Sequence, residues 1–252
     1  MRPEKPWPAL IPGLRALWKE AFGDTDAFLD LFFSTAYAPS RCRCILSEGR
    51  PAAALYWLDL WMGEKKFAYI YAVATAEKSR GQGLCRILME ATAADLKAAG
   101  YSGALLVPQD EALRAMYGRM GYLSAGAIDE FFCATGEHSA PGEEITPEAY
   151  AALRPSLLPP GSPAPDSTAL AFLGVLARFY RGEDFLAVAS REQEHLRILE
   201  YLGDRDRLPG FIAGLGAAEA TVRAPGNGKP FAMYRPLTPD CKKPTYFPFA
   251  FD

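Results

Sequence analysis

The sequence predicts an α/β protein of the α+β kind, in which helices flank a mixed, mostly antiparallel sheet and a second, smaller α+β unit follows. Three observations support this prediction. Apolar residues alternate with a period of two over residues 41–75, they follow a helical period after Gly83, and residues 136–167 are rich in proline and glycine. Because 50% of the 252 residues are apolar, the chain can form two cores. We therefore expect two domains, at residues 1–135 and 136–252.

The N-terminal region predicts two short helices, Pro12 to Phe22 and Asp26 to Tyr37, with Gly23 ending the first of them. Three antiparallel strands should follow, separated by turns at Glu48-Gly49 and Gly63-Glu64. Their expected ranges are Arg41 to Ser47, Ala53 to Trp61 and Lys66 to Thr75.

One more helix with an apolar face is expected from Leu84 to a C-cap at Gly100. The first domain should then close with three elements. These are a strand from Tyr101 to Val107, a helix from Asp110 to Arg119 and a strand or hairpin from Tyr122 to Ala134.

The second domain should begin with a short helix, Pro147 to Leu153, whose N-cap is Thr146. Its later elements are a helix from Ser167 to Tyr180, a hairpin of Phe185 to Ser190 with His195 to Leu202, a helix around Leu208 to Leu215, and strands near Ala220, Ala232 and Phe247. This order loosely repeats the hairpin, helix and strand of the first domain. The second domain is therefore interpreted as a degenerate copy that lacks a Gly-rich turn.

The charge balance argues against nucleic-acid and membrane partners. The chain has 27 basic and 30 acidic residues, a formal net charge of -3, and no run of like charges that resembles a basic arm or a polybasic anchor. Residues 1–8 include three prolines and no apolar signal segment. We expect a cytoplasmic protein and leave its oligomeric state open.

The five cysteines predict free thiols. Their number is odd, and only Cys42 and Cys44 are close in sequence, without a second pair or a nearby histidine to complete a zinc site. These two side chains should share one face of a strand and pack there. No metal site is expected.

Glycines at positions 81 and 83 mark a candidate anion site between the third predicted strand and the next helix. The first N–H groups of a helix lack partners within it, and the helix dipole favours an anion there. Glycine allows a tight turn and removes side chains that would keep a ligand away, while Arg80 and Arg86 add positive charge. The loop predicts a diphosphate site; a helix-capping turn without a ligand is the alternative.

Other phosphate motifs do not fit this loop. No Gly-Lys-Ser/Thr follows it, so it is not a P-loop, and Arg86 stands where the dinucleotide fingerprint needs its third glycine. Among common strand–loop–helix anion sites, the site of acyl-CoA users remains.

The segment Arg80-x-x-Gly83-x-Cys85 resembles the R-x-x-G-x-G/A signature of the GNAT (GCN5-related N-acetyltransferase) superfamily, with Cys85 in place of the last small residue. As in that family, a strand of the type Val73-Ala74-Thr75 precedes it. The resemblance covers residues 41–134 and implies a GNAT-like fold.

A second segment supports the same resemblance. The stretch from Asp110 through Tyr117 to Tyr122 is similar to the family's N-x-x-A-x-x-x-Y-x-x-x-G-F segment, with Asp110 replacing Asn and Leu113 replacing Ala. Residues 117–125 and the second domain also resemble, more weakly, the enhanced-intracellular-survival type of multi-domain acetyltransferase.

The resemblance implies that acetyl-CoA is the co-substrate. Backbone groups of Val73 and Thr75 would bind pantetheine, an N–H there would also serve the oxyanion, and the loop would bind the diphosphate. The expected cofactor-binding residues are Val73, Ala74, Thr75, Arg80, Gly81, Gln82, Gly83, Leu84, Cys85, Arg86 and Asp110.

Tyr117 is the predicted catalytic residue. The departing CoA thiolate has a thiol-like pKa of about 8.5, and a phenol with a pKa of about 10 can protonate it without being ionised at neutral pH. The resemblance implies the same role. The alternative is that Tyr117 only packs on the apolar face of its helix, with Leu113 and Met120.

No general base is evident. An alkylamine with a pKa of about 10.4 must be neutral to attack, which costs about 4.6 kcal/mol at pH 7, so the site must be acidic or partly buried. Asp59, Asp110, Glu130 and a water chain are unranked candidates. The enhanced-intracellular-survival resemblance adds the C-terminal carboxylate of Asp252.

Aromatic side chains cluster on adjacent predicted strands, at Tyr56, Trp57, Trp61, Tyr69 and Tyr71. They form either core packing or a wall that binds a cationic amine through cation–π contact. His138 and His195 have no nucleophile partner at a recognisable spacing, so we expect them at the surface.

These features predict an acyl-CoA-dependent N-acyltransferase that moves an acetyl group to a primary amine of a small molecule. Two alternatives stay open. One is a non-catalytic acyl-CoA-binding or regulatory module, and the other is a transferase for another acyl donor or a protein amine. Fold analogy alone points to small amines.

Overall fold

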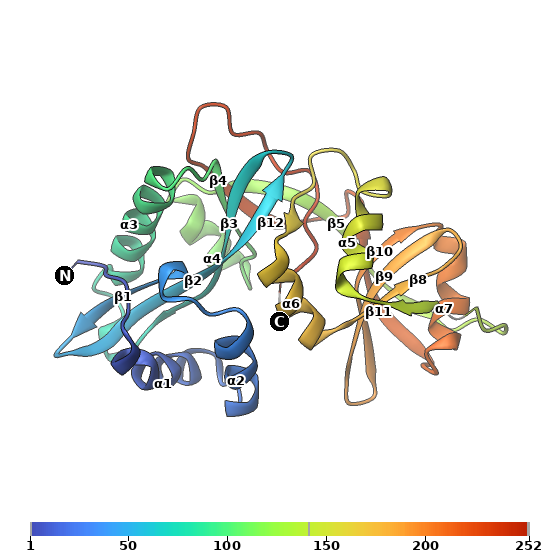
Figure 1. The fold of residues 1–252 in the computed structure, drawn as a ribbon, viewed down its shortest axis with the longest axis horizontal. Helices are drawn as coiled ribbons and strands as arrows, with labels where there is room; N and C mark the ends of the chain where they lie inside the picture. Colours follow the sequence, from blue (N-terminus) through green and yellow to red (C-terminus); the bar gives the residue numbers. More distant parts are fainter. Residues whose placement is uncertain (1, 141, 251–252) are drawn as a thin grey trace. The chain divides into compact units, whose positions relative to one another are not determined.

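The computed structural model describes residues 2–140 and 142–250 (Figure 1). These residues pack as two compact units, each assembled from several stretches of chain. Unit 1 holds residues 2–123, 165–172 and 234–242, and unit 2 holds residues 124–140, 142–164, 173–233 and 243–250. The expected domains at 1–135 and 136–252 remain a prediction, because packing units and domains are different divisions of a chain.

Unit 1 begins with a 3₁₀ turn, η1 (Pro8–Leu10), followed by α1 (Ile11–Phe22) and α2 (Asp26–Thr35). Gly23 ends α1 in the left-handed conformation, with φ of 76°. The Thr25 hydroxyl then caps α2 by accepting a hydrogen bond from the N–H of Phe28, at 3.2 Å. Both helices therefore begin and end close to where the sequence predicted.

The sheet of unit 1 has three antiparallel strands, β1 (Cys42–Ser47), β2 (Arg50–Met62) and β3 (Lys65–Thr75). A 3₁₀ turn, η2 (Pro39–Arg41), leads into β1. Glu48 and Gly49 both have positive φ, as the tight turn of a β-hairpin requires. After η3 (Glu77–Ser79) and α3 (Leu84–Ala98), β4 (Gly103–Leu106) returns parallel to β3, and α4 (Glu111–Gly118) follows.

Helices cover both faces of this sheet (Figure 1). On one face, Trp18 of α1 lies against Phe32 of α2 and Tyr56 of β2, with ring centroids 4.6 and 5.0 Å away. On the other face, Arg43 of β1 stacks over the ring of Trp57 and bonds Asp95 of α3 at 2.7 Å. Since neighbouring residues of a strand point to opposite faces, Tyr56 and Trp57 necessarily join different layers.

Six hydrogen-bonded strands in the described part of unit 2 lie in the order β5-β11-β10-β9-β8-β6. Most neighbouring pairs are antiparallel, while β10 and β11 are parallel. These strands are β5 (Leu123–Ala134), β6 (Glu143–Ile145), β8 (Arg178–Arg181), β9 (Phe185–Glu192), β10 (His195–Gly203) and β11 (Glu219–Pro225). The other elements after residue 124, some of which cross between the units along the sequence, are α5 (Pro147–Leu153), η4 (Arg154–Ser156), β7 (Ala164–Pro165), α6 (Ser167–Leu176), η5 (Arg205–Arg207), α7 (Leu208–Gly214) and β12 (Lys229–Pro236).

Both units contain the same succession of elements. In unit 1 the hairpin β2–β3 leads through η3 and α3 to β4, which is parallel to β3. In unit 2 the hairpin β9–β10 leads through η5 and α7 to β11, which is parallel to β10. The register of each hairpin also shifts once, near Ala72 and near Leu199. This agreement supports the interpretation of the second half as a degenerate copy.

A buried ion pair joins distant stretches of unit 2. Arg154 and Glu200 are 2% and 0% exposed, and the guanidinium donates to both carboxylate oxygens at 2.8 Å. The Tyr150 hydroxyl also donates to Glu200, and the ring of Phe249 lies 5.3 Å from the guanidinium carbon. Burial raises the pKa of Glu200 and lowers that of Arg154 to about 10, so each charge depends on its partner.

Two predicted elements of the second half are wrong. The helix expected to reach Tyr180 ends at Leu176, because residues from Arg178 onward pair with β9 instead. The strand expected near Phe247 does not form in the described tail, residues 243–250. Phe247 and Phe249 are 0% and 1% exposed, so their alternation reflects packing of an irregular segment rather than a ladder.

Three of the expected elements agree closely with the structure. They are the short helix α5, capped by the Thr146 hydroxyl, the hairpin β9–β10, and α7. In the described part of the chain, no helix combines the length and the apolar character needed to cross a membrane.

Candidate active site

Gly81 and Gly83 give the loop before α3 its shape. Their φ angles are 75° and 76°, in the left-handed region that residues with a Cβ disfavour. A Cβ added at either position would meet nothing within 4 Å. The backbone turn therefore favours glycine here, and the space next to the loop is open to a ligand.

The N-terminus of α3 presents free N–H groups at this loop. Gly83 is the N-cap, no side chain caps the helix, and the first turn has no acidic residue. Arg80 and Arg86 are exposed, and Arg80 uses its Nε to donate to the carbonyl of Thr75 at 3.3 Å. The loop thus combines backbone donors, positive charge and exposure, the set that an oxyanion such as a diphosphate needs.

Three further residues of the predicted cofactor site differ in exposure. Gln82 is exposed and its amide donates to the carbonyl of Lys78 at 3.5 Å. The Leu84 side chain is only 4% exposed, so it belongs to the core and only its backbone faces the loop. Cys85 is half-buried, and burial raises the pKa of its thiol. A neutral thiol fits the position that the family signature gives to a small residue.

The turn before the loop is tied to α1. A side-chain oxygen of Glu20 accepts a hydrogen bond from the N–H of Glu77, at 2.6 Å, where η3 begins. This contact fixes the point at which the chain leaves the sheet and enters the glycine turn. Sequence reasoning missed it, because a single exposed glutamate 57 positions away leaves no local signal.

β3 carries a bulge close to the loop. The pairing with β2 passes from Tyr56–Tyr71 to Ala54–Ala74, so Ala72 and Val73 together lie opposite Leu55. Ala72 has a φ of 48°, unusual for a residue with a Cβ. A bulge bends its strand and changes the direction of the backbone N–H and C=O groups. Sequence reasoning missed this feature, because alanine gives no signal of a left-handed conformation.

Beyond the middle of β3, the parallel ladder with β4 stops. The recorded pairs run from Phe67–Gly103 to Tyr69–Leu105, while β3 continues to Thr75. Val73 and Thr75 are half-buried and Ala74 is 3% exposed, so these residues offer mainly backbone groups to a ligand. An extended ligand can bond such a strand edge as an added strand would.

Tyr117 lies on α4, near the loop. Its side chain is 7% exposed, and its ring packs edge-on against Tyr122 with centroids 5.8 Å apart. Burial raises the pKa of Tyr117, and the nearby Cys85 thiol adds to the rise. The phenol therefore lies close to the first turn of α3 and stays protonated at neutral pH.

The candidate bases are already engaged in the structure. The Asp110 carboxylate caps α4 by accepting from the N–H of Leu113 at 2.7 Å. Asp59, 8% exposed, accepts from the Tyr101 hydroxyl at 2.6 Å and pairs with Lys66 at 2.8 Å. These contacts give both groups a structural role.

The two remaining candidate bases lie in the second half of the chain. Glu130 pairs with Arg223 and Lys229. Burial alone would raise the pKa of Glu130, but hydrogen bonds from those two cations outweigh it and lower the pKa below its usual 4.5. Asp252 lies outside the described residues.

The aromatic cluster on the strands divides into two groups. Tyr56, Trp57 and Tyr69 are at most 4% exposed and belong to the core, whereas Trp61 is 43% exposed. Tyr71 is half-buried and stacks on Tyr69, with ring centroids 6.1 Å apart. Core packing thus accounts for most of this cluster.

The two histidines are exposed, as expected. His195 bonds the Thr221 hydroxyl at 3.0 Å, and neither histidine belongs to the constellation around the loop.

The glycine turn, the open strand edge and the phenol define a class of site. A helix N-terminus that can hold a diphosphate, next to a strand edge that can hold an extended amide chain, suits the two parts of CoA. The arrangement therefore suits an acyl-CoA-dependent transferase. Residues 8–125 match the family model described as an acetyltransferase (GNAT) domain, so this part of the chain is a GNAT domain.

The similarity to solved structures with the same fold extends beyond residues 8–125. The GCN5-related N-acetyltransferase from Anabaena variabilis superposes with a TM-score of 0.73 at 18% identity, over 94% of this chain and 73% of that one. The corresponding protein from Kribbella flavida gives 0.71 at 16% identity, over 93% and 70%. Eis1 from Mycobacterium abscessus gives 0.64 at 11% identity, over 93% and 73%. A search of curated proteins finds no match.

These comparisons confirm the GNAT-like fold and the resemblance that the loop and the α4 segment predicted. Every residue of the predicted cofactor and catalytic set lies within the matched segment 8–125. The general activity supported for the chain is therefore N-acetyl transfer that uses an acyl-CoA.

Proposed function

We propose that this protein transfers an acetyl group from acetyl-CoA to a primary amine of a small molecule. The observation that carries the proposal is the uncapped Gly81–Gly83 turn of α3, next to the unpaired end of β3 and the Tyr117 phenol. Each part matches one requirement of thioester aminolysis.

The loop and β3 would bind the donor. The first N–H groups of α3, together with Arg80 and Arg86, hold the diphosphate. Backbone groups of Val73 and Thr75 bond the pantetheine amides. An N–H of the bulge at Ala72 would donate to the thioester carbonyl, where a donor stabilises the negative charge that develops as the amine attacks.

Tyr117 would protonate the departing thiolate. Because burial raises the pKa of this phenol, it keeps its proton throughout the physiological range and can give it up to a stronger base. The proton of the attacking amine leaves through water or through the Asp252 carboxylate, since Asp59, Asp110 and Glu130 are engaged elsewhere.

The setting of this activity is the cytoplasm, without nucleic-acid or membrane partners. All five cysteines are free, as in proteins of reducing compartments. The balanced charge, with 27 basic and 30 acidic residues, gives no basic surface tract in the sequence.

Calorimetric titration with acetyl-CoA tests the donor site. The Gly83→Glu variant places a carboxylate where the diphosphate should bind and should abolish saturable binding. Gly63→Glu is the matched control, because Gly63 also has a positive φ, 60°, and open space around its Cβ position, but lies in the β2–β3 turn. Equal binding by both variants, or none by the folded wild-type protein, contradicts the proposal.

One observation favours a second function, non-catalytic acyl-CoA binding. The described candidate bases are all held by cations or by a helix N-terminus. A panel of small amines and of peptides with free amino groups, assayed for CoA release, separates the two functions. Competition among acetyl-, succinyl- and longer acyl-CoA for binding identifies the donor.

A further inference from the structure

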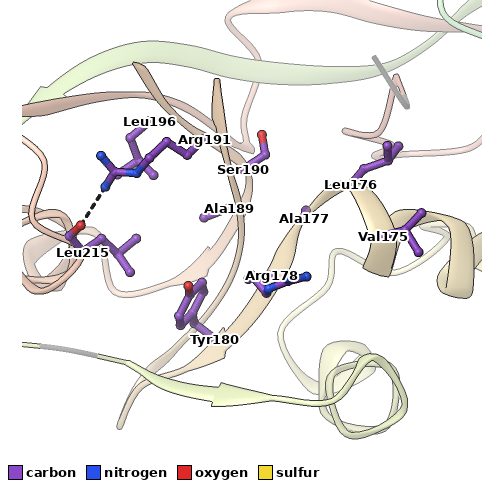
Figure 2. Close-up of a pocket in the computed structure, with 10 residues that line it drawn as sticks. All are labelled: Val175, Leu176, Ala177, Arg178, Tyr180, Ala189, Ser190, Arg191, Leu196 and Leu215. Carbon is purple, nitrogen blue, oxygen red and sulfur yellow. Dashed lines mark hydrogen bonds between the residues drawn. The ribbon is translucent and has the colours of Figure 1, made fainter. Parts of the chain in front are cut away.

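Unit 2 contains a cavity of about 330 Å³, near the lower end of the range of small-molecule sites (Figure 2). Residues of β8, β9 and β10 line it, together with the ends of α6 and α7. None of the residues predicted to bind acetyl-CoA lies in it. The cavity is therefore formed by other residues than the proposed donor site.

Small residues and a helix end create this space. Ala189 lies opposite Arg178 in the β8–β9 ladder, and Leu196 lies opposite Arg191 in the β9–β10 ladder, so these four side chains share one face of the sheet. Ala189 and Leu196, 5% and 3% exposed, provide an apolar floor. Helix α7 covers this face but ends at Gly214, and Leu215 forms a wall of the cavity.

Two guanidinium groups border the apolar floor, as Figure 2 shows. Arg191 donates from Nη2 to the carbonyl of Leu215 at 2.7 Å, and within the described residues no carboxylate pairs with it. Arg178 donates from Nη1 to the carbonyl of Gly174 at 3.3 Å, and its one carboxylate partner among the described residues is Glu144 at 3.5 Å. The side chains of Arg178 and Glu144 are both about 60% exposed. An exposed pair at that distance contributes at most about 1 kcal/mol, so Arg178 can exchange it for a ligand.

The phenol of Tyr180 completes the polar lining. Burial and the nearby Glu144 carboxylate raise the pKa of Tyr180, and Arg178 and Arg191 oppose the rise. The phenol therefore lies in the field of both guanidinium groups. Donors from three side chains therefore lie around an apolar floor, and this combination suits a carboxylate attached to an apolar body.

We propose that this cavity is a second ligand site, which binds a small organic anion with an aromatic or short aliphatic body. The carboxylate lies between Arg191 and Arg178 and accepts from the Tyr180 hydroxyl. The apolar body covers Ala189 and Leu196.

A purely structural role for Arg191 makes a different prediction. A cation near the C-terminus of α7 stabilises the helix by bonding its last carbonyls. That role uses one of the five N–H donors of the guanidinium, and it needs neither the apolar floor nor Arg178. Binding and stability measurements on the same variants separate the two roles.

Calorimetric titration of the full-length protein with benzoate tests the site, with benzamide as the neutral isostere and acetate as the charge without an apolar body. We expect saturable binding of benzoate, and affinity at least about tenfold lower for the other two probes. Arg191→Gln and Arg178→Gln should each weaken benzoate binding by about tenfold or more. Ala189→Leu fills the floor and should abolish binding.

Arg207→Gln is the matched control, because Arg207 is another half-exposed arginine of unit 2, pairs with Glu183 and Asp184, and does not line the cavity. Thermal unfolding checks that each variant is folded. If Arg191→Gln does not fold, benzoate binding by Arg178→Gln and Ala189→Leu tests the proposal. Absence of benzoate binding to the wild-type protein, equal binding of benzamide, or full binding by Ala189→Leu overturns the proposal. Acetyl-CoA binding is measured separately, so its failure leaves this result unaffected.

Discussion

Two neighbouring tyrosines, Tyr117 and Tyr122, show that similar burial does not imply the same function. Tyr117 and Tyr122 are 7% and 3% exposed and contact each other, and burial raises the pKa of both phenols. Only Tyr117 lies on α4 at the position that the family signature gives to the proton donor. Neighbouring phenols of similar burial therefore provide an internal control for catalysis.

Tyr117→Phe should lower kcat about 10²- to 10⁴-fold, because the thiolate then leaves without a proton from the enzyme. The KM for acetyl-CoA should change little, since the ring and its packing remain. Steady-state CoA release measures both constants, and Tyr122→Phe should retain nearly full kcat. Equal losses in the two variants would assign a packing role to Tyr117.

The Glu130 carboxyl allows a prediction of how the folding stability depends on pH. Hydrogen bonds from Arg223 and Lys229 hold its folded-state pKa below the usual 4.5, although burial opposes them. A depressed carboxyl pKa stabilises the folded state above the unfolded-state value, and this contribution is lost as the pH falls through the folded-state value. Glu130→Gln should therefore cost about 0.5–1 kcal/mol near pH 7 and almost nothing near pH 3.

Urea unfolding of the wild type and the variant from pH 7 to pH 3 measures this difference. Glu219→Gln serves as the control, because Glu219 is exposed and has no recorded ion pair among the described residues. A Glu130→Gln effect that persists at pH 3 would show that the carboxylate charge is not its source.

The bulge of β3 is the element on which the proposed oxyanion contact depends. Ala72 adopts a φ of 48°, where a Cβ costs about 1–2 kcal/mol and glycine costs nothing by sterics. Ala72→Gly should therefore stabilise the protein by about 0.5–1 kcal/mol, after the larger entropy of glycine in the unfolded chain is subtracted. Ala74→Gly, two residues along the same strand, should destabilise it.

Thermal or urea unfolding of both variants measures the sign. If the two substitutions destabilise equally, the left-handed conformation at Ala72 is not present in solution. CoA release by Ala72→Gly then shows whether the bulge acts through its geometry or through its rigidity.

Elements differ in how well the sequence predicts them. The glycine turn and α3 were predicted because glycine at 81 and 83 and the apolar spacing after Gly83 are local signals. The bulge at Ala72 had no local signal. β8 was predicted as the end of a helix, since the apolar run of α6 continues into Phe179, and only pairing with β9 makes it a strand. Local patterns specify helices and turns, whereas partners far away in sequence decide short strands.

The candidate site shows the same division. The loop residues and Tyr117 could be predicted from one short segment each, because each depends on neighbours in sequence. The Glu20 contact to Glu77 and the ion pairs of Asp59 and Glu130 could not, because each joins residues from different elements. Sequence reasoning therefore found the donor site and left the base undecided.

At the scale of the whole molecule, each packing unit is built from separated stretches of the chain. Residues 165–172 and 234–242 belong to the N-terminal unit, although they lie far along the sequence. In unit 2 the Arg154–Glu200 pair joins the end of α5 to β10, and Phe249 brings the tail to the same guanidinium. A buried pair of this kind specifies which stretches meet, because each charge is tolerated only beside the other.

Removing one member of this pair should strongly lower the free energy of unfolding, whereas replacing the whole cluster should change it little. Glu200→Leu leaves Arg154 buried without its carboxylate and should destabilise the protein by about 3–5 kcal/mol. The triple variant Tyr150→Phe, Arg154→Met, Glu200→Leu removes the carboxylate together with the guanidinium and the Tyr150 hydroxyl that bond it, and its stability should lie within about 1–2 kcal/mol of the wild type. Urea unfolding measures both. If the triple variant is as unstable as Glu200→Leu, the cluster contributes net stability rather than specificity, and its hydrogen bonds outweigh the cost of burying two charges.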